Sequence, residues 1–169
     1  MIGIIKRRAE RGFAFTVNEK QYAERIGPRQ DVWGDAYCKC LVLSFNAVTE
    51  WANESAWPGK VSYVFESGHA SQTRANRMMQ GLFNIPALKE THRYLGHSFV
   101  DKRLMPGLQA ADILAWQWAM DFKRRQERKT RRLDLDGLLE LRHTVLHFSD
   151  SVLDEYRKAG DVVAELTKS

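Results

Sequence analysis

The stretch from His97 to Arg125 constrains this chain most, because it joins a short apolar strand to a long helix through one turn. Pro106 suits the first turn of a helix, where its missing N–H costs nothing. The spacing predicts a helix from there on, with an apolar stripe made of Leu108, Ala111, Ala115, Trp118, Ala119 and Phe122. Asp112 falls on the same stripe, so we expect this helix to place a carboxylate on its core-facing side.

A carboxylate at Asp112 needs a partner, since burying an ionised side chain alone carries a large free-energy cost. Asp112 lies too far into the expected helix to be its N-cap. Two interpretations stay open. Asp112 either binds a metal ion, or it is a structural residue that pairs with a buried Arg or Lys or reaches water at the boundary of the core.

The bulk properties indicate one α/β domain over residues 1–169. Residues 1–35 are poorly defined, and residues 133–169 are predicted as two C-terminal helices broken near Phe148. The net charge of +5 gives a mild bias toward polyanions. Two cysteines are too few for a disulfide framework or a four-cysteine zinc site. No apolar run has the length of a signal peptide or a membrane span, so we expect a cytoplasmic protein without a membrane partner.

A strand, a helix and a second strand follow one another in the middle of the chain. The segment before them, residues 35–54, looks helical, with one side made of Tyr37, Leu41, Ser44, Phe45, Val48 and Ala52. Residues 61–66 form the clearest strand, and the second apolar strand runs from Tyr94 to Asp101. Residues 70–83 between these strands also look helical, with Met78 and Leu82 toward the core. This order predicts parallel strands joined by a right-handed crossover. Glu66 and Asp101 then sit at the carboxyl ends of their strands, where open α/β sheets place their sites.

Together with Asp112, these residues would bring three carboxylates to one edge of the sheet. Oxygen ligands suit Mg²⁺ or Mn²⁺, and such ions activate water in phosphodiester cleavage. Glu66, Asp101 and Asp112 are therefore the candidate metal ligands. The alternatives are that Glu66 ends a strand and faces solvent, and that Asp101 forms a surface ion pair with Lys102 or Arg103.

Residues 123–132 hold seven basic residues and one acid, and we call them the basic run. The run begins roughly 17 Å beyond Asp112 along a continuous helix, within reach of phosphates distant from the carboxylates. It is equally typical of a solvated helix end. The candidate contacts to DNA or RNA are Arg74, Arg77, Arg124, Arg125, Arg128 and Arg132. His143 and His147 lack the glutamate of a zinc-binding helix motif and are interpreted as ordinary helix residues.

Three motifs resemble the bacterial and phage family called domain of unknown function 3800. They are Val-Phe-Glu-Ser-Gly at 64–68, Phe-Val-Asp-Lys at 99–102 and Gly-Leu-Gln-Ala-Ala-Asp-Ile-Leu-Ala at 107–115, and the likeness spans about residues 10–160. The resemblance implies a ribonuclease H-like mixed sheet flanked by helices, and a metal-dependent nuclease (hydrolase) site. Glu66 and Asp112 match the family's acidic positions, while Asp101, Lys102 and Gln109 match neighbouring motif residues. The implied catalytic set is Glu66, Asp101, Lys102 and Asp112.

This sequence departs from the family at its amino end, where an Asp-Glu-Ser-Gly strand is usual. We therefore expect an N-terminally truncated fold that binds Mg²⁺ in the millimolar range and has little or no nuclease activity. The strand at 61–66 would keep an exposed edge that invites a homo-oligomer. The alternative function is a non-catalytic module that binds nucleic acid or another protein.

Overall fold

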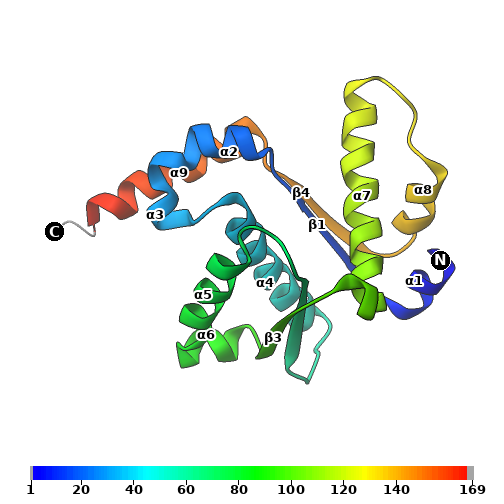
Figure 1. The fold of residues 1–169 in the computed structure, drawn as a ribbon, viewed down its shortest axis with the longest axis horizontal. Helices are drawn as coiled ribbons and strands as arrows, with labels where there is room; N and C mark the ends of the chain where they lie inside the picture. The colour runs from blue at the N-terminus through cyan, green and yellow to red at the C-terminus, as the bar shows by residue number, and fades with distance from the viewer. Residues whose placement is uncertain (1, 167–169) are drawn as a thin grey trace. The chain divides into compact units, whose positions relative to one another are not determined.

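The computed structural model describes residues 2–166, apart from the side chains of residues 28, 31, 32 and 162–166. Helices and strands alternate along this part of the chain (Figure 1). The α-helices are α1 (Ile2–Arg8), α2 (Glu19–Ile26), α3 (Gln30–Trp33), α4 (Ala36–Glu54), α5 (Gln72–Phe83), α6 (Pro86–Thr91), α7 (Pro106–Gln126), α8 (Leu133–Leu139) and α9 (Asp150–Leu166). The strands are β1 (Gly12–Thr16), β2 (Val61–Glu66), β3 (Tyr94–Val100) and β4 (His143–His147), and two short 3-10 helices are η1 (Gly27–Arg29) and η2 (Lys102–Leu104).

The strands pair as two small sheets, β1 with β4 and β2 with β3. In each pair, the residues joined by backbone hydrogen bonds rise in number together along both strands, so both sheets are parallel. These bonds join Val61 to Arg93 and Ser67 to Val100 in one sheet, and Gly12 to Arg142 and Phe148 to Thr16 in the other. The α/β class and the parallel strand–helix–strand unit are confirmed. Within the described residues, two separate two-stranded sheets replace the single mixed sheet that we expected.

The chain divides into two compact units, each assembled from three segments. The first unit comprises residues 2–14, 62–69 and 96–145, and the second comprises residues 15–61, 70–95 and 146–166. The division falls within all four strands. Folding of the whole chain as one domain stays a prediction.

The second unit holds most of the buried apolar side chains. Tyr22 and Ile26 of α2 pack with Phe148 and Leu153 in one core cluster. Helix α4 buries Leu41, Phe45 and Ala52, as its periodicity predicts. Helix α5 buries Ala75, Met79 and Phe83, a stripe one residue later than the expected Met78 and Leu82. The apolar content of these helices therefore goes into ordinary core packing.

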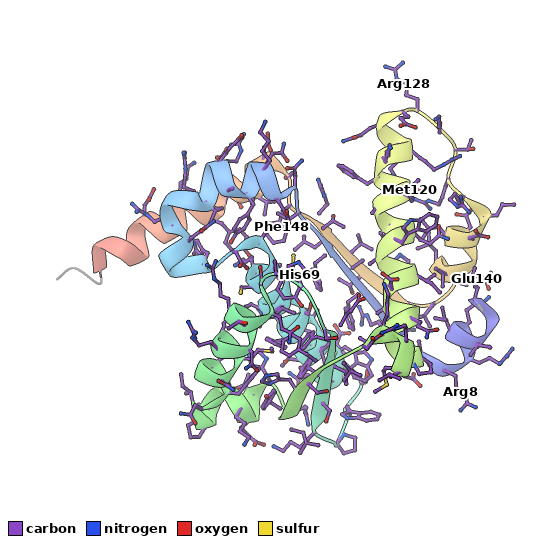
Figure 2. All side chains as sticks on the ribbon, viewed as in Figure 1. Arg8, His69, Met120, Arg128, Glu140 and Phe148 are labelled. Carbon is purple, nitrogen blue, oxygen red and sulfur yellow. The ribbon has the colours of Figure 1, made fainter. Side chains whose placement is uncertain are left out.

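The first unit is built around α7 and α8, which pack against each other (Figure 1). Leu135 and Leu138 of α8 are buried. Lys6 of α1 pairs with Glu140, which follows α8 and is labelled in Figure 2. This unit is thus held by a small apolar contact together with ion pairs.

The expected apolar stripe of α7 is wrong for most of its residues. The buried side chains of α7 are Gln117 and Asp121, whereas Ala111, Ala115, Ala119 and Phe122 of the stripe are exposed and Leu108 and Trp118 are half-buried. The ion pairs that Asp121 makes with arginines of the basic run allow a polar side chain to take the inner position. Periodicity therefore predicted the helix but assigned the wrong face to its interior.

The segment from His143 to His147 is also a correction, because it forms strand β4 where we expected helix. Its partner is β1, which lies near the other end of the chain. A parallel partner so distant in sequence leaves no local signal. His147 lies 2.9 Å from the Thr16 hydroxyl of β1, and the His143 ring packs 5.8 Å from that of Trp118. Both histidines thus have structural partners.

Candidate functional site

The candidate site lies in the first unit, where β2 and β3 end side by side. Glu66 is the last residue of β2, and Ser67 donates its N–H to the carbonyl of Val100, the last residue of β3, at 3.0 Å. The chain then forms the short turn of η2 from Lys102 and enters α7 at Pro106. Because the loops are so short, residues from two strand ends and the first turns of α7 are brought close together.

Lys102 joins the two acidic residues at this place. Its ammonium nitrogen lies 3.2 Å from Oε1 of Glu66 and 3.2 Å from Oδ2 of Asp112. The two carboxylate oxygens are therefore no more than twice that distance apart. We call Glu66 and Asp112 the carboxylate pair. Their hydrogen bonds to the ammonium, first that of Asp112 and then that of Glu66, raise the pKa of Lys102 above its ordinary value.

Asp112 does not face a core, as the α7 periodicity suggested. Its side chain is 52% exposed and meets the side chain of Lys102, which is itself 41% exposed. Asp112 is therefore a boundary residue that reaches water, and its partner Lys102 is exposed where the sequence suggested a buried cation. Metal binding by Asp112 stays a prediction.

Asp101 is engaged elsewhere. Its carboxylate accepts hydrogen bonds from the backbone N–H of Arg103 at 2.9 Å and from the Arg103 guanidinium at 3.0 Å. The side-chain hydrogen bond, followed by the backbone one, lowers the pKa of Asp101. Asp101 thus caps η2 and forms the surface ion pair with Arg103 that was one of its two open interpretations. Its role as a metal ligand stays a prediction.

The donor set can be tested against a divalent cation. Among the described residues, no three His, Cys, Asp or Glu side chains are grouped so that they could hold a metal ion. Mg²⁺ often binds through one or two carboxylates and keeps several waters. Glu66 and Asp112 fit one such weakly held ion, because both already face a single cation. They do not fit a site that requires three protein ligands.

The basic run is partly tied into the structure. Arg125 and Arg131 lie 2.7 and 3.2 Å from the carboxylate of Asp121, which is only 3% exposed. Arg124 donates to the carbonyl of Thr130 at 2.7 Å. The four residues Arg124, Arg125, Arg131 and Asp121 therefore close the loop that follows α7, which a solvated helix end would not do.

Arg128 and Arg132 are arranged differently. Arg128 follows α7 with a positive φ of 55°, and its side chain extends away from the end of the helix (Figure 2). Arg132 lies 2.9 Å from Asp134, and its guanidinium is 5.3 Å from the centre of the Trp116 ring. Trp116 is about half exposed, so this arginine and this indole share an open surface.

Arg74 and Arg77 belong to α5 and therefore to the second unit, apart from the basic run in the first. Arg74 lies 3.1 Å from Asp35, the N-cap of α4, and Arg77 is exposed. The six candidate arginines are thus shared between two units. A phosphate-binding role for them stays a prediction.

Lys39 is a chemically distinctive residue that the sequence did not single out. It is 7% exposed, and its ammonium lies 4.5 Å from the centre of the Trp33 ring and 3.8 Å from that of Tyr156. We call these two rings the aromatic clamp. Burial lowers the pKa of Lys39 to about 8. Tyr156 comes from α9, far along the chain, so no local pattern could have identified this environment.

Three comparisons with known proteins bear on identity. The chain matches no protein-family model, no curated protein and no solved structure. Within the described residues, no helix combines the length and the apolar character needed to cross a membrane.

Proposed function

We propose that this chain, although its strands form two small sheets, is a divergent ribonuclease H-like protein whose carboxylate pair binds Mg²⁺ or Mn²⁺ and acts on phosphodiesters of DNA or RNA. The observation that supports the proposal is the position of one ammonium group 3.2 Å from both Glu66 and Asp112. Two carboxylates that converge on one monovalent cation provide the oxygen ligands that a small divalent cation prefers. The motif resemblance adds the reaction class.

Each residue of the site has a separate proposed role. Glu66 and Asp112 would hold the ion, which would supply Lewis-acid polarisation of a phosphoryl oxygen and a water of lowered pKa. Lys102 supplies a positive charge at the same place, suited to a phosphate oxygen. Gln109 donates from Nε2 to the backbone carbonyl of Lys102 at 3.2 Å and so fixes where that side chain starts. Asp101, held by Arg103, stabilises the turn that carries Lys102.

Titration calorimetry with Mn²⁺ and Mg²⁺ tests the site directly. We expect one weak site of millimolar affinity, lost in Asp112→Asn and in Glu66→Gln because each removes one of only two charged ligands. Asp134→Asn is the matched control, since Asp134 is also an exposed acid paired with a cation, Arg132. Equal binding by wild type and both site variants would contradict the proposal.

A cleavage assay on single- and double-stranded DNA and RNA addresses the reaction. Two ligands are fewer than a two-metal site generally uses, so we expect little or no cleavage by residues 1–169. Any Mg²⁺-dependent cleavage should fall at least about a hundredfold in Asp112→Asn, because the ion-binding carboxylate is removed. Cleavage that survives this substitution would remove Asp112 from the site.

A non-catalytic role in binding nucleic acid is the second candidate, and the exposed Trp116 ring beneath Arg132 favours it. A base can stack on such a ring while cations contact phosphates. Arg128→Gln and Lys123→Gln leave the ion pairs of Asp121 intact. Each should therefore weaken binding and reduce the salt slope by about one if it contacts a phosphate. Lys20→Gln is the control. If the salt dependence of nucleic-acid binding is unchanged in Arg128→Gln and Lys123→Gln, the basic run does not contact phosphates and has a structural role only.

A further inference from the structure

The carboxylate pair already has a cation, and that cation belongs to the chain. The Lys102 ammonium contacts the same two side chains, Glu66 and Asp112, that would ligate a divalent ion. A Mg²⁺ ion binds carboxylate oxygens at about 2.1 Å. An ion there would lie within about 5 Å of an ammonium that kept its present contacts, and like charges at that distance repel each other.

Two hydrogen bonds hold the backbone of Lys102, whereas its side chain is partly exposed. The Lys102 carbonyl accepts hydrogen bonds from Nε2 of Gln109 at 3.2 Å and from the backbone N–H of Met105 at 3.3 Å. The ammonium sits at the end of a four-carbon stem, and the side chain is 41% exposed. Ion pairs between exposed side chains are weak, so releasing the ammonium to water requires little energy.

We propose that Lys102 is an internal competitor for the metal site, and that a divalent cation binds the carboxylate pair only when the ammonium has left it. This inference rests on the proposed function, because it presupposes that Glu66 and Asp112 can hold the ion. It assigns Lys102 a regulatory role as the resident cation, which sets how much metal the site takes up at a given concentration.

The competition has a direct consequence for affinity. The apparent affinity for metal is reduced by the fraction of molecules in which the ammonium occupies the pair. Removing the ammonium while keeping the length of the side chain should raise the affinity for metal. Two exposed ion pairs of ordinary strength correspond to an increase of about three- to tenfold.

The experiment compares Mn²⁺ binding by wild type, Lys102→Met and Lys129→Met, using calorimetry and the electron paramagnetic resonance signal of free Mn²⁺. Lys129 is the matched control, because it is an exposed lysine that pairs with a single carboxylate, Glu127, at 2.8 Å. Thermal unfolding of each variant confirms that it folds. Lys102→Gln removes the same charge and serves as a second variant if Lys102→Met does not fold.

We expect Lys102→Met to bind Mn²⁺ about three- to tenfold more tightly than wild type and Lys129→Met to match wild type. Wild type that binds as tightly as Lys102→Met, or more tightly, would overturn the competition while leaving the metal site in place. Failure of all three proteins to bind Mn²⁺ would overturn the proposed metal site, and the inference would fall with it. An equal gain in Lys129→Met would show a general charge effect and would also overturn the inference.

Discussion

Two lysines of this chain are held in opposite ways. Lys102 in the first unit is exposed and lies between two carboxylates, and their hydrogen bonds raise its pKa. Lys39 in the second unit is buried between two aromatic rings, and no carboxylate among the described side chains forms an ion pair with it. Burial lowers its pKa to about 8.

The difference shows which physical effect controls each charge. Around Lys102 the charged partners dominate and water weakens them, so the arrangement can be exchanged at low cost. Around Lys39 the loss of water dominates, and the attraction of the rings recovers only part of that loss. An exposed ion pair such as that of Lys102 therefore suits a side chain that must release its partner. A buried ammonium such as that of Lys39 instead makes the stability of the fold depend on the charge.

The strongest test of the buried setting is Gly160→Ala in α9. A Cβ at this position would lie 2.6 Å from Nε1 of Trp33 and 3.3 Å from Cβ of Arg29. The indole is rigid and donates to the carbonyl of Tyr156 at 3.0 Å, so it cannot move without opening the aromatic clamp. We expect a loss of about 1–3 kcal/mol in the free energy of unfolding, measured with urea.

Gly81→Ala in α5 is the matched control for that substitution. A Cβ at Gly81 meets nothing within 4 Å, so the change should stabilise the helix by about 0.5–1 kcal/mol. If Gly160→Ala is stabilised to the same extent, the aromatic clamp is looser than its geometry indicates.

A smaller effect is expected for Lys39→Met, which replaces a buried ammonium by an apolar side chain of similar length. The lowered pKa means that the charged form costs up to about 3 kcal/mol in the folded state, and imperfect packing of the new methionine against the rings offsets part of the gain from removing that charge. The variant should therefore be more stable than wild type by about 1 kcal/mol at pH 7.

The difference in the free energy of unfolding between wild type and Lys39→Met should depend on pH. The folded state of wild type loses the Lys39 proton near pH 8, whereas the unfolded state keeps it until near the ordinary pKa of 10.5. Between these values the unfolded state binds more protons, so the stability of wild type rises with pH relative to Lys39→Met. Unfolding of both proteins by urea from pH 7 to 10 measures this, and a constant difference would place Lys39 in contact with water.

The smallest effect is expected for Lys102→Met on stability. The ammonium and both carboxylates are exposed, so the melting temperature should fall by no more than about 2–4 °C at low salt, and by less at high salt. A larger drop would mean that Lys102 holds the end of β2 to α7 and does more than occupy the carboxylate pair.

Much of the candidate site could be predicted from sequence, because its residues lie close to one another along the chain. Glu66 ends a strand that its own composition predicts, and Lys102 and Asp112 are separated by a turn and the first turns of a helix. Periodicity nevertheless assigned Asp112 to a buried face, since the alanines around it match an inward stripe equally well. In the structure Asp121, which pairs with Arg125 and Arg131, lies on the buried side of α7, and Asp112 lies on the exposed side.

The sequence by itself determined the local elements. Strand β2 at 61–66, helix α4 and helix α7 follow from spacing, capping and turn residues within a few positions. The tertiary structure decided the rest: the pairing of β4 with β1, the inner face of α7, and the burial of Lys39 between α3 and α9. The strand pairing and the burial of Lys39 depend on partners far along the chain, namely β1 and Tyr156. The inner face of α7 depends on ion pairs of Asp121 with Arg125 and Arg131, whose free energy is set by how much water the folded chain excludes from them. No local pattern records either effect.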